Sequence, residues 1–340
     1  MTSTRPLRHV PDELLSFIEA YETYYILGHV EPDGDCIGSQ LSLSLFLRRI
    51  GKKTQLVSPG PFERSEVRHF ADRFLTSIPP ASDDGERSPE AVIIVDCSTL
   101  DRIGNLAEEL RGLPVAVIDH HSSGEIFGDV RFVDSTVAAT TLLVQALIEA
   151  RGETIATNEA ELLFFGLATD SGFFRFLDRS SEDVFAAASR LVAAGASPRE
   201  VSGMIVGGRS FASRKLIGNL LSRAQSYFHG RFVLTYMTAD ERREYGKENR
   251  DSDALYGLLL SIDECEAIAF IREESSDVCK GSLRASGPVD VGKVASTLGG
   301  GGHQKAAGFL QRRSLTDTIK EVVARVGVEL GEESGTALPR

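Results

Sequence analysis

The sequence predicts an α/β protein: an N-terminal domain on a parallel sheet and a smaller C-terminal α+β domain, with a cleft between them. Short apolar or β-branched runs first alternate with helix-like segments, the pattern of parallel βαβ units. Strand-like runs alternate with helices again beyond residue 230. The length of 340 residues also exceeds what one hydrophobic core usually organises, so two domains are expected.

The first domain is expected over residues 1–190. Its parallel strands are predicted at residues 24–28, 54–57, 91–95 and 115–118. Residues 135–150 have the apolar face of a buried helix. Residues 161–167 lead into a further acidic segment, and we expect that segment to follow a strand end as the others do.

Helical patterns over residues 182–194 and 198–226 predict a linker at residues 191–225. The second domain is then expected over residues 226–330. Its strands are predicted at residues 231–237, 266–272 and 278–285. Residues 331–340 lack apolar periodicity and predict a disordered tail.

The composition limits the partners and the compartment. A formal net charge of -12 argues against capture of long nucleic acid, because that affinity comes from many Lys and Arg contacts to phosphates. The four cysteines are scattered, which suits a reducing compartment. No apolar run is long enough to cross a bilayer, and no apolar segment follows Arg5 and Arg8 as in a signal peptide. We therefore expect a cytoplasmic protein that takes small substrates and does not bind membranes.

Acidic and histidine residues gather just after the predicted strands, where open parallel sheets place their functional crevice. The clusters are His29 with Asp33 and Asp35, then Asp96, then Asp119 with His120 and His121, and lastly Asp170. A mixture of imidazoles and carboxylates suits Mn²⁺ or a related ion. Six or seven ligands are too many for one ion and suit two, an arrangement that generates hydroxide and binds a phosphate for in-line displacement.

Each cluster taken alone has a simpler interpretation. Asp33-Gly-Asp35 is typical of a turn whose side chains cap backbone groups, and paired histidines after a strand can be merely hydrogen-bonded. Cys36 and Cys97, beside the predicted ligands, more often pack as small apolar groups. The recurrence of the same residue types at several predicted strand ends favours metal-dependent phosphoester hydrolysis.

A run of four glycines, residues 299–302, precedes His303 and forms the second signal. Such a loop, opening a helix, can bind an anion through the backbone N–H groups of Gly300, Gly301 and Gly302. His303 and Arg284 would supply further donors to a phosphate. The loop is not a Walker motif, and the alternative is a flexible hinge.

Together these residues resemble the DHH phosphoesterase superfamily, and specifically its DHH–DHHA1 branch. The motifs occur in order as His29-x-x-x-Asp33-x-Asp35, Asp96, Asp119-His120-His121 and Asp170-Ser-Gly, followed by the glycine run with His303. The resemblance extends from about residue 24 to residue 310. In size and layout the chain is most similar to bacterial nanoRNases that also dephosphorylate 3′-phosphoadenosine 5′-phosphate (pAp), and to standalone phosphodiesterases of cyclic di-AMP and pApA.

The resemblance implies a role for each residue. His29, Asp33 and Asp96 would hold a first ion, and a bridging hydroxide would be the nucleophile. Asp35, Asp96, His120 and Asp170 would hold the second ion, with Asp96 shared. Asp119 would orient the neighbouring imidazole, and His121 would face the scissile phosphate. Arg284, Ser286 and His303 would bind the distal phosphate or nucleotide, and Arg175 would add a phosphate contact.

The chain departs from the family pattern at three positions. Gly124 stands where many relatives carry Asn, Ser171 where Thr is common, and Cys36 where Ala is common. These departures bear on substrate preference and not on metal binding.

The expected substrates are oligonucleotides of about two to five nucleotides, RNA or DNA, linear dinucleotides such as pApA, and pAp. Three alternatives remain open: a cyclic di-AMP phosphodiesterase, a pyrophosphatase or exopolyphosphatase, and a non-catalytic nucleotide-binding regulator. A homodimer is a common arrangement for small α/β enzymes, and the sequence leaves the oligomeric state open.

Overall fold

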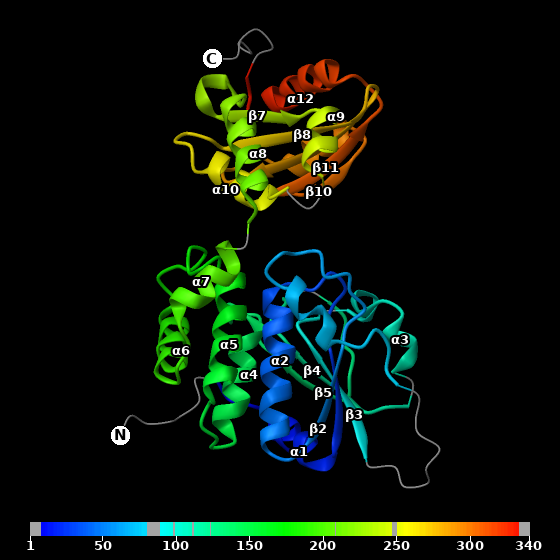
Figure 1. The fold of residues 1–340 in the computed structure, drawn as a ribbon, viewed down its shortest axis with the longest axis vertical. Coiled ribbons are helices and arrows are strands. Elements are labelled where there is room, and N and C mark those ends of the chain that lie inside the picture. Colours follow the sequence, from blue (N-terminus) through cyan, green and yellow to red (C-terminus); the bar gives the residue numbers. More distant parts are fainter. Residues whose placement is uncertain are drawn as a thin grey trace. The chain divides into compact units, whose positions relative to one another are not determined.

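The chain divides into two compact units, Met1–Gly208 and Arg209–Arg340 (Figure 1). The computed structural model describes residues 8–79, 89–97, 99–110, 112–122, 124–207, 209–246 and 250–332. The boundary between the units falls inside the segment 191–225 that the sequence assigns to a helical linker. Most of the predicted tail, residues 333–340, lies outside the described residues.

The first unit is built on a parallel sheet with the strand order β2-β1-β3-β4-β5. Its elements are α1 (Asp12–Ala20), β1 (Thr23–Leu27), α2 (Gly34–Arg49), β2 (Lys53–Val57), η1 (Arg68–Arg73), β3 (Glu90–Val95), η2 (Leu100–Ile103), α3 (Leu106–Glu109), β4 (Val115–Asp119), β5 (Val130–Val133), α4 (Thr140–Ala150), α5 (Thr157–Asp170), α6 (Glu182–Ala193) and α7 (Pro198–Val206). The winding reverses after β2, so β1 and β3 are neighbours. Ligands of open α/β sheets bind at such a reversal, beyond the carboxyl ends of the strands.

Helices cover both faces of this sheet, which explains why its strands are almost continuously apolar. Tyr24 and Ile26 pack into a core with α1, α2, α4, α5 and α6. Tyr25 and Leu27, with the alternate side-chain direction, pack into a second core with η2 and α3. Figure 1 shows α2, α4 and α5 on one side of the sheet and α3 on the other.

The helices α2 and α5 approach each other closely, because glycines lie at their contact. A Cβ atom on Gly38 would lie 2.7 Å from the carbonyl oxygen of Leu162, and one on Gly166 would lie 3.0 Å from Asp35 Oδ1. Since α2 begins beside β1 and α5 ends at Asp170, this packing fixes the distance between two elements that carry predicted ligands.

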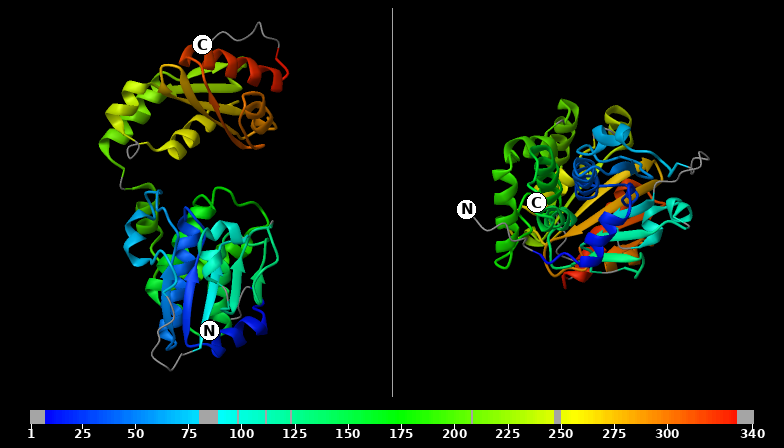
Figure 2. Two further views of the ribbon diagram at one scale, coloured as in Figure 1. Left: turned by 90° about the vertical axis from the view of Figure 1, so that its right-hand side faces the viewer. Right: turned by 90° about the horizontal axis from the view of Figure 1, so that it is seen from below.

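The second unit is built on a mixed sheet with the strand order β10-β11-β9-β8-β7-β6. Its elements are α8 (Phe211–Ser222), β6 (Gln225–Tyr227), η3 (Phe228–Gly230), β7 (Phe232–Met237), α9 (Ala239–Tyr245), α10 (Ser252–Leu260), β8 (Ala267–Ser275), β9 (Val278–Ala285), α11 (Val291–Thr297), β10 (Gly301–His303), β11 (Ala306–Gln311) and α12 (Leu315–Glu329). All pairs are antiparallel except β7 with β8. Helix α12 lies along one face of this sheet (Figure 2).

The predicted fold class is confirmed: a parallel-sheet unit is followed by a smaller α+β unit. The predicted helix at 135–150 begins later, at Thr140, and the pattern over 198–226 forms two helices, α7 and α8. Strands β5, β6, β10 and β11 are additional to the prediction. They are short, from three to six residues, which leaves little sequence periodicity to detect.

Two local predictions are wrong. Asp170 does not follow a strand, because residues 157–170 form helix α5, and an apolar run of this kind cannot be assigned from periodicity alone. The glycine run does not open a helix. Gly299 and Gly300 follow α11, and Gly301 and Gly302 start the hairpin of β10 and β11. Gly302 has φ +146, and a Cβ there would lie 2.5 Å from the backbone of Ala307, so the glycine serves the hairpin itself.

We expect Gly38→Ala to lower the free energy of unfolding by about 1–3 kcal/mol, because the added methyl must push α2 and α5 apart. Gly203→Ala on α7 is the matched control: a Cβ there meets no atom within 4 Å, and the change should stabilise that helix slightly. Urea denaturation measures both. Equal stability of the two variants would contradict the close packing of α2 on α5.

Candidate metal centre

The first ligand group lies at the junction of β1 and α2. His29 follows β1, and its Nδ1 lies 2.7 Å from the carbonyl oxygen of Val30, which leaves Nε2 for the site. Asp33 is the N-cap of α2 and accepts hydrogen bonds from the backbone N–H groups of Asp35 and Cys36, both at 3.1 Å. Asp35 follows in the first turn. The Asp33-Gly-Asp35 segment is therefore both a helix cap and a donor of carboxylates.

The second and third groups come from β3 and β4. Asp96, 2% exposed, follows β3 with φ 55, a conformation that is uncommon outside glycine and best tolerated by Asn and Asp. Asp119 is the last residue of β4, and His120 and His121 follow it. His120 Nδ1 lies 3.3 Å from the carbonyl oxygen of Val137, so Nε2 faces the site. Asp170 completes the set from the end of α5.

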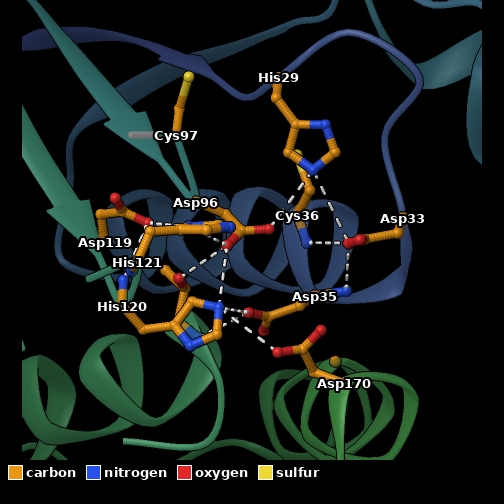
Figure 3. A network of polar contacts seen from close by, with 12 residues as sticks. His29, Asp33, Asp35, Cys36, Asp96, Cys97, Asp119, His120, His121 and Asp170 are labelled. Atoms are coloured by element: carbon orange, nitrogen blue, oxygen red, sulfur yellow. Dashed lines mark hydrogen bonds and ion pairs between the residues drawn. The ribbon is translucent and has the colours of Figure 1, made fainter. Parts of the chain in front are cut away.

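These side chains converge on Asp96, as Figure 3 shows. Asp96 Oδ2 lies 3.5 Å from His29 Nε2, and Asp96 Oδ1 lies 3.6 Å from His120 Nε2. His29 Nε2 is also 3.9 Å from Asp33, and His120 Nε2 is 3.4 Å from Asp170 and 3.9 Å from Asp35. The two oxygens of Asp96 thus face two separate groups of nitrogen and oxygen atoms.

Two threonines at the start of α4 hold the most buried carboxylates, and the sequence analysis did not find them. The backbone N–H groups of Thr140 and Thr141 donate to Asp35 at 2.6 and 3.0 Å, and the Thr141 hydroxyl donates at 2.9 Å. The Thr140 hydroxyl donates to Asp96 at 3.0 Å. A helix N-terminus favours negative charge. The signal was the pair of adjacent threonines opening an otherwise apolar helix.

Burial, together with charges of neighbouring groups, shifts the pKa values of the site residues. Burial, reinforced by Asp96 and Asp170, raises the pKa of Asp35 well above its ordinary value. Burial also raises the pKa of Asp170 to about 6, although His120 opposes the shift. Burial alone would lower the pKa of His29, but hydrogen bonding to the carboxylates of Asp33 and Asp96 raises it. The site therefore attracts cations, either protons or metal ions.

A dyad of Asp119 and His121 lies beside Asp96. His121 Nδ1 lies 2.7 Å from Asp119 Oδ1, which also accepts the backbone N–H groups of His120 and His121. This hydrogen bond raises the pKa of His121 and, against the effect of burial, lowers that of Asp119. A hollow of about 280 Å³ is lined by His121, Asp119 and Arg131 among others.

Among the residues that the structure describes, three sets of donor atoms are close enough to hold a metal ion. Within each set the atoms lie within 4.8 Å of one another: His29, Cys36 and Asp96; Asp96, His120 and His121; and Asp35, His120 and Asp170. Burial raises the pKa of Cys36 to about 11, so its thiol is neutral. The oxygen and nitrogen donors fit divalent first-row ions, which accept carboxylate and imidazole together.

The predicted substrate residues of the second unit lie around β9 and the β10–β11 hairpin. Arg284 is on β9, and its guanidinium lies 4.6 Å from the ring centroid of Tyr256. His303 is exposed on β10, and the exposed Ser286 donates to the carbonyl oxygen of Cys265 at 2.9 Å. Arg175, in the first unit, is exposed and donates to the carbonyl oxygen of Gly172 at 2.8 Å.

Comparison with known proteins gives matches to both units. Residues 23–167 match the DHH family, N-terminal domain, and residues 229–326 match the DHHA1 domain. The bifunctional oligoribonuclease and PAP phosphatase NrnA of Thermus thermophilus is 31% identical over 322 residues, covering 94% of this chain and 93% of the relative. The Bacillus subtilis protein of the same name is 27% identical over 300 residues, covering 87% and 91%.

A solved structure has the same fold along nearly the whole chain. An exopolyphosphatase-related protein from Bacteroides fragilis superposes with a TM-score of 0.79 at 23% identity, covering 93% of this chain and 95% of that one. In the part of the chain that the structure describes, no helix is both long and apolar enough to span a membrane.

We expect Mn²⁺ to stabilise the protein, and more strongly at pH 7.5 than at pH 5.5. Because the folded-state pKa of Asp170 is raised from 3.8 to about 6, ionisation of this group costs stability as the pH rises through that window, and an ion offsets the cost. At a hundredfold excess over Kd the gain is about 2.7 kcal/mol, or about 5–10 °C in Tm.

Thermal unfolding of chelator-treated protein, with and without Mn²⁺ at constant ionic strength, measures this effect. A Tm that does not respond to Mn²⁺ at either pH would contradict a metal centre at these residues.

Proposed function

The chain belongs to the DHH family of phosphoesterases, and we propose that it hydrolyses short oligonucleotides, linear dinucleotides such as pApA, and pAp at two divalent ions, with Mn²⁺ the preferred metal. The observation that carries the proposal is the placement of Asp96 between two groups of metal-binding donors, with one oxygen facing each. The names of the relatives support short oligoribonucleotides and PAP as substrates.

The residues divide into two ligand sets around Asp96. His29 and Asp33 would hold one ion with it, and Asp35, His120 and Asp170 the other. Two such ions, when bound, supply a hydroxide at neutral pH and neutralise charge on a phosphate. The surrounding residues of the protein hold these side chains in position. Thr140 and Thr141 do so for the buried carboxylates through their hydrogen bonds.

The dyad orients a proton donor toward the substrate. Since Asp119 Oδ1 accepts from His121 Nδ1, the free Nε2 of His121 is directed away from the dyad and can donate to a phosphate oxygen or a leaving group. The lowered pKa of Asp119 favours its ionised form, and the raised pKa of His121 favours the protonated ring.

The second unit contributes groups that recognise phosphate. Arg284, Ser286 and His303, with the N–H groups of residues 300–302, would bind the part of the substrate that is not cleaved, and Arg175 would add a contact from the first unit. A net charge of -12 gives no support to binding of long strands, so small substrates are favoured. We place the protein in the cytoplasm, where its four unpaired, buried cysteines remain reduced.

A substrate panel tests the proposal directly. With Mn²⁺, purified protein should hydrolyse pApA, pAp and di- to pentanucleotides, and should be much slower on long strands and on pyrophosphate. Asp96→Asn should reduce turnover to background, since Asn tolerates φ 55 but cannot bridge two cations. Asp101→Asn, on the nearby η2, is the control and should keep full activity.

The three alternative functions would give different results in this substrate panel. Preference for cyclic di-AMP over pApA would indicate the cyclic-dinucleotide enzyme, and preference for pyrophosphate would indicate a pyrophosphatase. Tight binding of pApA without turnover would indicate a regulator.

We expect Asp119→Asn to lower kcat by about 10- to 100-fold while KM changes little, because the amide no longer fixes the orientation and charge of His121. The pKa of His121, followed by NMR, should fall, because the hydrogen bond that raises it is lost. Asp134→Asn, whose carboxylate accepts from Thr136, is the control. An unchanged kcat would show that the dyad takes no part in the reaction.

A further inference from the structure

Arg272, on β8 of the second unit, is a buried cation with no ion-pair partner among the described residues. It is only 6% exposed, and among the described residues no carboxylate lies within 4.0 Å of its guanidinium. Its Nη1 lies 3.4 Å from Ser282 Oγ, and its guanidinium lies 5.3 Å from the ring centroid of Phe270. Its Nε is buried with no hydrogen-bond partner.

Such an arrangement costs stability. Burial lowers the pKa of Arg272 and the positive charge of Arg250 acts in the same direction, while Tyr256 and Glu274 oppose the shift. Removing a charge from water is unfavourable unless a partner compensates for it, and a well-packed apolar side chain is often more stable at such a position. A buried guanidinium whose Nε has no hydrogen-bond partner is therefore a candidate position for an anion.

The register of the sheet shows what lies next to Arg272. In the antiparallel pair of β8 and β9, Arg272 lies opposite Lys280, and Phe270 lies opposite Ser282. Side chains of residues directly opposite each other, and those two positions along, share one face of the sheet. Arg272, Ser282 and Arg284 therefore occupy the same face.

The next two strands extend this face with small residues. Gly308 on β11 lies opposite Ser282, and Ala306 lies opposite Arg284. His303 on β10 in turn lies opposite Ala306. Ser282, Gly308 and Ala306 are the small residues of this face. Arg284 and His303 lie in one row across the strands, and Arg272 lies on the side of Ser282 that is away from this row.

Helices cover only part of this face. The apolar core formed with α8, α9 and α10 includes Val233 and Met237 on β7 and Ile268 and Phe270 on β8, and it contains no residue of β9, β10 or β11. Leu310, at the end of β11 on the same face, is 51% exposed. Helices α11 and α12 pack on the opposite face. Ser282, Arg284, Ala306 and Gly308 are half-buried on this face, so part of their surface reaches solvent.

The same aromatic pair supports both arginines. The guanidinium of Arg284 lies 4.6 Å from the ring centroid of Tyr256, and the rings of Tyr256 and Phe270 are 6.4 Å apart with an edge-to-face geometry. Arg272 lies over the Phe270 ring. Cation–π contacts of this kind orient a guanidinium without neutralising it, so both charges remain available to an anion.

We propose that Arg272 and Ser282 bind a terminal, non-scissile phosphate of the substrate, next to the position that Arg284 and His303 take. Arg272 and Ser282 then add to the groups that contact this one phosphate, and the enzyme prefers substrates with a terminal phosphate over equally long substrates without one. This inference rests on the proposed function, because it names the substrate class of the same enzyme.

The test compares pApA with ApA, which lacks the 5′-phosphate. Arg272→Gln should lower kcat/KM for pApA by roughly 10- to 100-fold, the loss expected for a charge-assisted contact, and should leave the value for ApA within about twofold. Arg272→Met should lower pApA turnover equally while its Tm stays the same or rises, which a merely structural arginine would not show. Arg313→Gln removes an equal charge from an exposed side chain paired with Glu321, and should change neither substrate.

Equal losses on both substrates, or no loss on either, would overturn the assignment. The failure of the proposed function gives a different result, namely wild-type protein that hydrolyses neither dinucleotide. In that case calorimetric binding of pApA and ApA to Asp96→Asn protein, with and without Arg272→Met, still decides the role of Arg272. A phosphate-dependent affinity that Arg272→Met abolishes supports the assignment, and an unchanged affinity refutes it.

Discussion

Mutual repulsion of buried carboxylates is the constraint on which the first unit depends. Asp35 and Asp96 are almost fully buried, and Asp33 and Asp170 lie beside them. Such a cluster is unstable unless hydrogen bonds and cations compensate for it. The N-terminus of α2 caps Asp33, the N-terminus of α4 supports Asp35, and the glycine contact of α2 with α5 keeps the helices close. The architecture thus gathers donor atoms that could hold cations.

The order of the strands in the sheet brings these side chains together. Because β1, β3 and β4 are consecutive neighbours in the sheet, their carboxyl ends present His29, Asp96 and His120 side by side. Asp96 is central because β3 is the middle strand of the three. A parallel sheet with reversed winding leaves this edge free of covering helices, as is usual for ligand sites in α/β folds.

The two units have opposite chemistry that suits one class of substrate. The first gathers carboxylates and imidazoles that bind cations, and the second presents Arg272, Arg284 and His303 on one open sheet face. Under the proposed function, a phosphorylated substrate is anionic at every phosphate, so cations held by the first unit and guanidinium groups of the second would each attract it. The chain as a whole is negatively charged, so Arg272, Arg284 and His303 form a small positive region on a negative protein. Such a distribution of charge favours small ligands over long polymers.

The sequence by itself determined the fold class and the four main strands of the first unit, and it pointed to acidic and histidine residues that the structure brings together, because buried parallel strands and the polar residues after them follow one another along the chain. Only the tertiary structure decided that Asp170 comes from a helix, that Thr140 and Thr141 hold the carboxylates, and that the glycine run forms a hairpin. Likewise, only the strand register places Arg272 on the same face as Ser282 and Arg284, because the register pairs residues that are distant in sequence. Contacts of this kind depend on which elements become neighbours, and no local pattern of residues specifies that.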